Sequence, residues 1–361
     1  MADKREFPHH MIKEIFEQPQ GLHDTIAPRI SLPEGVVQLN EVPIRGEELR
    51  GLNRINIVAS GTSRHAGMVG QYMIQDLANI PVDVDYASEF EYRNPMIGQS
   101  ELTIVITQSG ETADTGAAQR EAKVRGSRTV AISNVAGTTI AREADGVIYT
   151  LAGPEISIAS TKAFTAQMAA LFLFALHLGQ ARESLSADRR EFYIRELLDL
   201  PAKLKRLLEC ADQCEQIATE FHKVDDFLFL GRAIHYPIAM DGALKLKEVS
   251  YVHAEGYPTG ETKHGPNALI DENLPVVIIA TRDASDQGSM LRYEKTVSNI
   301  AGFKKQSSRV IALVSEDDKE IRKIADHSIT IPQAPELLSP ILEIVPLQLF
   351  AYYMAVKRGL D

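Results

Sequence analysis

The sequence predicts an α/β protein built from parallel, doubly wound (flavodoxin-like) sheets that are flanked by helices. Three observations predict this class. Short apolar runs alternate with helical stretches from residue 53 onward. The same alternation restarts after a polar, helical connector near 188–223. Two of the apolar runs end in loops rich in serine and threonine that open into a helix, the place where open α/β sheets bind their ligands.

The first half is expected to form one parallel sheet, because its strands are separated by helices. Strands are predicted at 55–59, 82–86, 102–106, 129–133 and 146–151. Helices are predicted at 66–78, at 112–124 and, as a long apolar helix, at 161–178. The segment 1–50 is predicted to be irregular apart from a helix near 11–16.

The second half is expected to repeat this plan. Strands are predicted at 227–230, 274–279, 309–314 and 328–331, and helices at 238–252, 290–300, 319–325 and 341–357. Local sequences also correspond, since Ala-Ser-Glu-Phe at 87–90 and His-Ala-Glu-Gly at 253–256 occupy comparable places in the two halves. The pattern indicates an internal duplication. The expected domains are an N-terminal segment 1–50, a first domain 51–185, a helical connector 186–222 and a second domain 223–361.

Composition excludes several classes of partner. The net charge of −11 argues against a general nucleic-acid surface or an anionic membrane surface. The N-terminus lacks the apolar core of a signal peptide, and the apolar run 168–178 is short for a bilayer span. The two cysteines, Cys210 and Cys214, are expected to be ordinary thiols on one helix face. We therefore expect a cytoplasmic protein with no nucleic-acid or membrane partner.

The two hydroxyl-rich loops, at 58–63 and 106–112, are the first candidate site. Backbone N–H groups at a helix N-terminus carry partial positive charge, and hydroxyl groups add donors. The hydroxyl groups belong to Ser60, Thr62, Ser63, Thr107, Ser109 and Thr112. Neither loop contains a lysine or matches the nucleoside-triphosphate loop, so the pair favours a single phosphate on a small molecule. Serine-rich turns after strands are also common as simple helix caps, and that interpretation stays open here.

The second half carries the titratable candidates. Asp241, Lys245 and Glu248 share one face of the predicted helix, and His264 follows in a loop. A carboxylate, a lysine and a histidine are suited to proton transfer and to opening a sugar ring. The same residues also fit a solvated ion-pair face and a loop histidine without a role. The sequence has no His-Glu-x-x-His motif, and neither a metal nor a cofactor is expected.

With these residues in view, the chain resembles the isomerase half of glucosamine-6-phosphate synthase (glutamine–fructose-6-phosphate aminotransferase), a tandem pair of sugar isomerase (SIS) domains. The resemblance covers nearly the whole chain, and its specificity comes from the order and number of the motifs. The motifs are His10–Ile15 with Glu17–Pro19, Gly61–Ser63, Ala87–Phe90, Gln108–Thr115, Ala159–Thr165, Gly242–Glu248, His253–Glu255 and Lys263–Pro266.

The resemblance implies a role for each matching residue. The implied phosphate-binding residues are Gly61, Thr62, Ser63, Thr107, Gln108, Ser109 and Thr112. Ser160 would contact the sugar, Glu248 would move a proton between C1 and C2, and Lys245 would support that transfer. His264 would open the ring from the neighbouring subunit, which implies a homodimer with a shared active site.

The implied activity is conversion of fructose 6-phosphate to glucosamine 6-phosphate. The family's glutaminase domain and its lysine-bearing tail have no counterpart in this sequence, so ammonia is expected from elsewhere, from a separate glutaminase domain or subunit. Asp241 and Thr107 stand where the family has Glu and Ser. Two alternatives stay open. One is a deaminase that releases ammonia from glucosamine 6-phosphate, and the other is a non-catalytic SIS regulator that binds a sugar phosphate.

Overall fold

The computed structural model describes residues 7–44 and 46–360 of the chain. The chain divides into two compact units. The first-sheet unit comprises Gln18–Glu155 and Lys162–Pro201, and the second-sheet unit comprises Met1–Glu17, Ile156–Thr161 and Ala202–Asp361. The predicted domain boundaries stay a prediction, and positions 1–6 of the predicted N-terminal segment lie outside the described residues.

The first-sheet unit contains one five-stranded sheet whose strands are all parallel. The strands, in spatial order, are β4 (Val82–Tyr86), β3 (Arg54–Ala59), β5 (Glu101–Thr107), β6 (Arg128–Ser133) and β7 (Gly146–Tyr149). This is the flavodoxin-like order 2-1-3-4-5. The three inner strands β3, β5 and β6 are almost entirely buried because helices cover both faces, and so they read as apolar runs, whereas the edge strands β4 and β7 are only partly buried.

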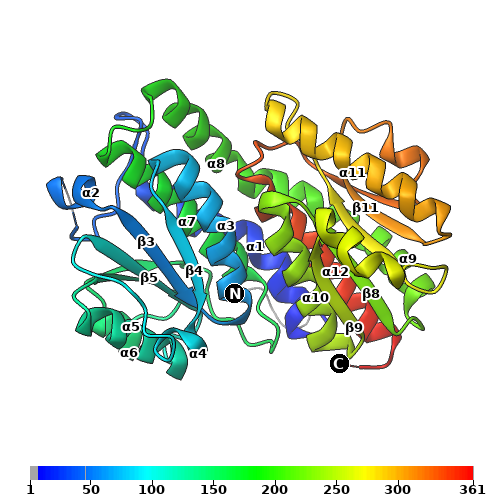
Figure 1. Ribbon diagram of the computed structural model, residues 1–361, viewed down its shortest axis with the longest axis horizontal. Helices are drawn as coiled ribbons and strands as arrows, with labels where there is room; N and C mark the ends of the chain where they lie inside the picture. Colours follow the sequence, from blue (N-terminus) through cyan, green and yellow to red (C-terminus); the bar gives the residue numbers. More distant parts are fainter. Residues whose placement is uncertain (1–6, 45, 361) are drawn as a thin grey trace. The chain divides into compact units, whose positions relative to one another are not determined.

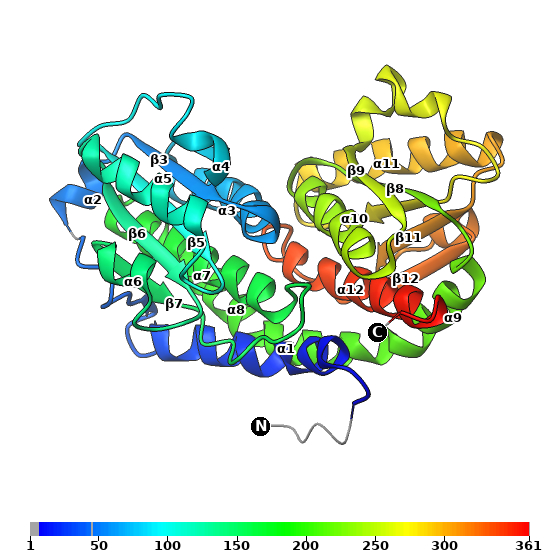
Figure 2. The same cartoon turned by 90° about the horizontal axis from the view of Figure 1, so that it is seen from below.

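The helices of this unit divide between the two faces of the sheet. Figures 1 and 2 show α3 with α7 on one face and α5 on the other. The helices are α2 (Glu47–Gly51), α3 (Gly61–Ala78), α4 (Ala87–Phe90), α5 (Ala113–Val124), α6 (Thr139–Glu143) and α7 (Lys162–Ala181), and a short pair, β1 (Ile30–Ser31) and β2 (Val36–Val37), precedes them. Two further helices, α1 (His10–Ile26) and α8 (Ala187–Leu207), run from one unit into the other.

The second-sheet unit repeats the arrangement. Its parallel strands, in spatial order, are β9 (His253–Pro258), β8 (Asp226–Gly231), β10 (Val276–Ala280), β11 (Val310–Ser315) and β12 (His327–Ile331). Numbered within the unit, this order is again 2-1-3-4-5, so the predicted duplication and the fold class are confirmed. Figures 1 and 2 show α11 (Gln287–Lys305) on one face of the sheet, with α10 (Tyr236–Ser250) and α12 (Ser339–Lys357) on the other. Helix α9 (Ala211–Phe221) packs against α12.

Two local predictions are wrong, and one helix was missed. Residues 253–256 form the start of strand β9, whereas the corresponding residues Ala87–Phe90 form the short helix α4 after β4. The predicted helix 319–325 is only a 3-10 turn, Ile321–Lys323. Helix α6 was not predicted at all, because its five residues are too few to show an apolar period.

Two helices, α7 and α12, are long and strongly apolar. Lys162–Ala181 and Ser339–Lys357 satisfy the length and composition of a membrane span, so the expectation that the run 168–178 is too short does not hold for the helix as a whole. In each helix 89% of the apolar window is buried inside the protein, as in the core helix of an α/β fold.

Candidate functional site

The first predicted loop joins β3 to α3. Strand β3 ends at Ala59, Ser60 is the N-cap residue, and α3 begins at Gly61. The Ser60 side chain makes no capping hydrogen bond, so the first N–H groups of the helix have no side-chain acceptor of their own there. Thr62 is buried, Ser63 is half-buried and Gly61 is exposed, with a left-handed φ of +53°.

The second predicted loop joins β5 to α5 and is ordered by its own hydroxyl groups. Thr107 Oγ1 lies 3.1 Å from Thr112 Oγ1 and accepts a hydrogen bond from the backbone N–H of Gly110 at 3.1 Å. Ser109 Oγ accepts from the backbone N–H of Glu111 at 3.2 Å. Thr107 is buried and Gln108 is half-buried, whereas Ser109 is exposed. Thr112 is the N-cap residue of α5 and also makes no capping hydrogen bond through its side chain.

The sheet topology brings the two loops to the same edge. Strands β3 and β5 are parallel neighbours, with Ala59 paired to Ile106, so both loops leave the carboxyl end of the sheet. Strand order reverses at this place, because β4 lies on the other side of β3. Ligands of open α/β sheets bind in the crevice at such a point. The two loops can therefore surround one anion with backbone N–H and hydroxyl donors.

A carboxylate that was not among the predicted site residues holds the second loop. Glu111 Oε1 accepts a hydrogen bond from the backbone N–H of Thr139, at the start of α6, at 2.8 Å. The Thr139 N–H lowers the pKa of Glu111, a fully exposed group. The backbone N–H of Ile140 also donates to the Gly110 carbonyl at 3.1 Å. The unpredicted helix α6 thus anchors the loop that carries Ser109 and Thr112.

The corresponding edge of the second sheet is filled by protein groups. The side chain of Asp286, the N-cap residue of α11, accepts the hydrogen bond of the Ser289 N–H, so a carboxylate already occupies this helix N-terminus. Buried His235 Nδ1 lies 2.9 Å from Glu343, which also accepts from Thr281 Oγ1 at 2.5 Å. Among the described residues, the hydroxyl-rich loops that lead into two uncapped helices are those of the first sheet, whereas in the second sheet Asp286 caps α11.

The titratable candidates of the second-sheet unit meet on α10. Asp241 and Lys245 are fully buried, and Lys245 Nζ donates to Glu248 Oε2 at 2.6 Å. The Glu248 side chain remains 32% exposed, whereas that of Lys245 is 0% exposed. A buried ammonium group thus holds a carboxylate that reaches solvent. One oxygen of Glu248 is fixed and the other is accessible to a ligand, which suits a proton-transfer base.

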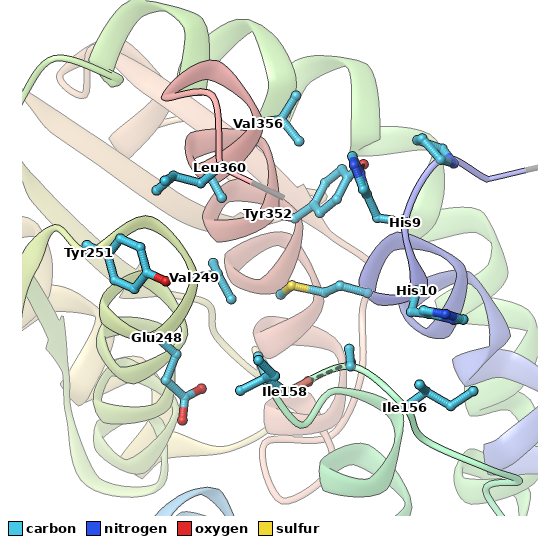
Figure 3. Close-up of a pocket in the computed structure, with 15 residues that line it drawn as sticks. His9, His10, Ile156, Ile158, Glu248, Val249, Tyr251, Tyr352, Val356 and Leu360 are labelled. Atoms are coloured by element: carbon cyan, nitrogen blue, oxygen red, sulfur yellow. Dashed lines mark hydrogen bonds between the residues drawn. The ribbon is translucent and has the colours of Figure 1, made fainter.

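Glu248 borders a pocket of about 440 Å³ that lies within the second-sheet unit. Figure 3 shows Glu248 and Tyr251 from α10 and its C-terminal end, Ile158 from the loop before α7, and Tyr352 from α12, with His9 from the N-terminal segment. The lining is Pro8–Met11, Ile156–Ala159, Glu248, Val249, Tyr251, Tyr352, Ala355, Val356 and Leu360. The pocket is concave and largely apolar with a few polar groups, as small-molecule sites are.

Of the predicted site residues, Glu248 alone lines this pocket. His264 is exposed, in the 3-10 segment Thr259–His264. Ser160 is half-buried and directly follows the pocket residues Ile158 and Ala159. Across the described residues there is no group of three His, Cys, Asp or Glu side chains that could hold a metal ion.

Comparison with known proteins gives consistent matches. The SIS domain family matches residues 48–177 and 220–358. The chain is 47% identical over 357 residues to the glutamine–fructose-6-phosphate aminotransferase (isomerizing) of Chlorobaculum tepidum, covering 99% of this chain and 57% of that relative. The chain thus spans little more than half the length of the curated relatives that it matches.

Solved structures agree in fold. The C-terminal domain of the glucosamine-fructose-6-phosphate aminotransferase of Francisella tularensis matches with a TM-score of 0.91 and 37% identity, covering 100% of this chain and 99% of that domain. A glucosamine-6-phosphate deaminase of Thermotoga maritima matches with a TM-score of 0.69 and 20% identity, covering 98% of this chain and 96% of that protein. The second likeness concerns the fold alone.

Proposed function

The chain belongs to the SIS domain family, as a tandem pair of such domains, and from this premise we propose that it is the isomerase portion of a glutamine–fructose-6-phosphate aminotransferase. The proposed reaction converts fructose 6-phosphate and ammonia to glucosamine 6-phosphate and water. The observation that carries the proposal is the pair Lys245–Glu248, a buried ammonium holding a carboxylate that is open to a pocket.

In this proposal, the loops of the first sheet bind the phosphate group. Seven residues contribute, namely Gly61, Thr62, Ser63, Thr107, Gln108, Ser109 and Thr112. The absence of capping side chains at α3 and α5 supports this role, because the N–H groups there are available to an anion. No lysine or arginine enters the loops themselves, which suits a monoester better than a triphosphate.

The proton transfer is assigned to Glu248. Ammonia adds to C2 of the open-chain ketose, and loss of water gives an imine at C2. Glu248 then removes a proton from C1, which leaves an enolamine, and returns a proton to C2, so that C1 becomes the aldehyde. Lys245 keeps the carboxylate in place through its 2.6 Å hydrogen bond, and Ser160 contacts the sugar.

Ring opening is assigned to His264, acting in the active site of a second copy of the chain. The exposure of His264 and its absence from the pocket of its own Glu248 support this assignment, because an exposed loop histidine is free to reach a neighbouring subunit. The chain is thus proposed to work as a homodimer with shared active sites. Ammonia would come from a glutaminase domain or subunit, and the proposed compartment is the cytoplasm.

Neither alternative activity is proposed. The relatives that are 44–47% identical to this chain over the aligned residues are named as aminotransferases. The deaminase resembles the chain in fold alone, at 20% identity. A regulator would need to bind sugar phosphate but would not need a carboxylate fixed by a buried ammonium group.

The test follows hydrogen at C1 and C2 of the substrate. Incubated with fructose 6-phosphate in deuterated water, the chain is expected to incorporate deuterium, and with ammonium it is expected to form glucosamine 6-phosphate. Glu248→Gln should slow both by about 10²–10⁴-fold while the Kd for fructose 6-phosphate changes by less than about threefold. Glu255→Gln, an exposed carboxylate on β9, is the matched control.

Three results would count against the proposal. Binding without any exchange would indicate a regulator. Ammonia release from glucosamine 6-phosphate without synthesis would indicate the deaminase. Equal loss of binding and turnover in Glu248→Gln would contradict the role given to this residue.

A further inference from the structure

The loop Ile156–Thr161 forms one wall of the pocket beside Glu248 and includes the proposed sugar contact, Ser160. It contains no helix or strand, and the Ile158 side chain is 98% exposed. An irregular loop with an exposed apolar side chain gains little stability from packing. Ala159 and Thr161 are buried, but the exposed part of the loop around Ile156 and Ile158 must be held by polar contacts.

Most of those contacts come from one buried carboxylate on α1. Glu14 is 2% exposed. Its Oε1 accepts the backbone N–H of Ile156 at 2.5 Å and that of Ser157 at 3.2 Å, and its Oε2 accepts the Ser157 hydroxyl. Backbone donors converging on one carboxylate fix both the position and the direction of the loop.

Glu14 has no cation to balance it among the described residues. In the described part of the chain, the hydrogen bonds of its carboxylate go to Ile156 and Ser157, and the lysine next to it in the sequence, Lys13, pairs with Glu17 at 3.5 Å instead. A buried carboxylate is costly unless its oxygens are hydrogen-bonded. The hydrogen bonds from the loop thus compensate for the burial of the Glu14 carboxylate, and breaking them would cost free energy.

The remainder of the loop is also tied. Ser157 Oγ lies 2.9 Å from the Ala159 carbonyl, which closes a tight turn around Ile158. Buried Gln348 on α12 donates to the Thr161 carbonyl at 3.4 Å. Residues 157 and 161 are therefore both fixed, and Ser160 lies between them.

We propose that Glu14 is a positioning residue, whose carboxylate holds the loop Ile156–Thr161 so that Ser160 and the pocket wall are in place for the sugar. The proposal rests on the proposed function, because that function assigns the sugar contact to this loop. A merely structural role for Glu14 would affect folding without affecting substrate affinity.

The test is Glu14→Gln, which keeps the shape but replaces one acceptor oxygen by an N–H donor that faces the loop N–H groups. The KM for fructose 6-phosphate is expected to rise about tenfold while kcat falls less than about threefold. Amide hydrogen exchange without substrate should become faster in a peptide covering 156–161 and stay unchanged in peptides from β8 and β10. Ser157→Ala, which removes the hydroxyl contacts to Glu14 and to the Ala159 carbonyl but keeps the backbone N–H bonds to Glu14, should show the same changes to a smaller degree.

Asp24→Asn is the matched control. It replaces a carboxylate on the same helix whose hydrogen-bond partner is the exposed side chain of Gln20 and not the loop. It should leave KM and loop exchange unchanged. Wild-type exchange in the 156–161 peptide of Glu14→Gln would overturn the proposal, and so would faster exchange with an unchanged KM. A wild-type chain that fails to bind or isomerise fructose 6-phosphate would instead overturn the proposed function. The hydrogen-exchange data would still show whether Glu14 holds the loop Ile156–Thr161.

Discussion

At the scale of single residues, Gly110 shows how closely the second loop is fitted to the protein. Its φ is +71°, a left-handed conformation that side chains with a Cβ rarely adopt. A Cβ placed on it would lie 2.0 Å from Thr138 Oγ1 and 2.5 Å from Thr138 Cβ. Both the backbone conformation and the space around it therefore require glycine.

A nearby glycine separates these two requirements. Gly137 has nearly the same φ, +72°, but a Cβ there would meet nothing within 4 Å. Gly137→Ala should cost only the conformational strain, about 1–2 kcal/mol. Gly110→Ala should cost more, about 3 kcal/mol or above, because it adds the clash, and it should also weaken binding of sugar phosphate. Urea unfolding and calorimetric titration measure the two effects. Equal losses of stability in the two variants would contradict this account.

The place of the hydroxyl-bearing loop residues in the fold was predictable from the sequence, and the residues that hold the loops were not. Thr107, Ser109 and Thr112 stand in one loop directly after an apolar run, so a local pattern suffices to find them. Glu111 and Glu14 act on backbone groups that lie 28 and 142 or 143 residues away along the chain. No local pattern encodes such a partner, and Glu14 reads in the sequence as one more helical carboxylate.

At the scale of elements, the two sheets share one topology and differ at one edge. Where the first sheet leaves two helix N-termini uncapped, the second has a network in which buried His235 and Glu343 join the partly exposed Glu336 and Arg292. His235 immediately precedes α10, the helix of Lys245 and Glu248. The network therefore ties the start of the proton-transfer helix to α12, which carries Glu343.

This network predicts a pH dependence of stability. Burial lowers the pKa of His235, but attraction to Glu343 and hydrogen bonds with Glu336 and Glu343 outweigh it and raise the pKa from 6.5 to about 9. Because the folded state holds the proton more tightly, the stabilisation is complete below about pH 6.5 and is lost as pH rises through about 9. The free energy of unfolding should fall by about 3 kcal/mol over this window.

At acid pH, stability is expected to fall as pH falls, because of Glu336. Burial raises the pKa of Glu336, yet hydrogen bonds from His235 and Arg292 lower it to about 2 from 4.5. This contribution is present above about pH 4.5 and is lost as pH falls through about 2. Urea titrations from pH 6 to 10 on the wild type, on His235→Gln and on His253→Gln, an exposed histidine, check the alkaline limb. A slope in His235→Gln as steep as that of the wild type would refute it.

The sequence prediction misses elements in which few side chains are buried and the apolar residues have no regular spacing. Strand β9 has the sequence His-Ala-Glu-Gly-Tyr-Pro, with two residues that disfavour strands and a single buried side chain. It is a strand because its backbone pairs with β8 at the edge of the sheet, a long-range effect. The central strands β5, β10 and β11 are apolar along most of their length, and such runs are found from sequence alone.

At the scale of the whole molecule, the proposed phosphate-binding residues and the proposed proton-transfer residues belong to different halves of the duplication. The uncapped loops belong to the first-sheet unit, and Lys245, Glu248 and the pocket belong to the second-sheet unit. His264 belongs to the second-sheet unit too, but is exposed and lies outside the lining of that pocket. His264 is therefore expected to act in the site of a second copy of the chain, related by two-fold symmetry.

Two inactive variants can test this shared site. In a two-fold dimer, each site would combine Glu248 of one copy with His264 of the other. A heterodimer of Glu248→Gln and His264→Gln chains, purified through two different tags, would then contain one site with both changes and one with neither. It should recover about half of the wild-type activity per dimer, although each parent homodimer is nearly inactive. A doubly tagged Glu248→Gln homodimer is the control. If the heterodimer stays as inactive as its parents, His264 acts within its own subunit and the shared site is wrong.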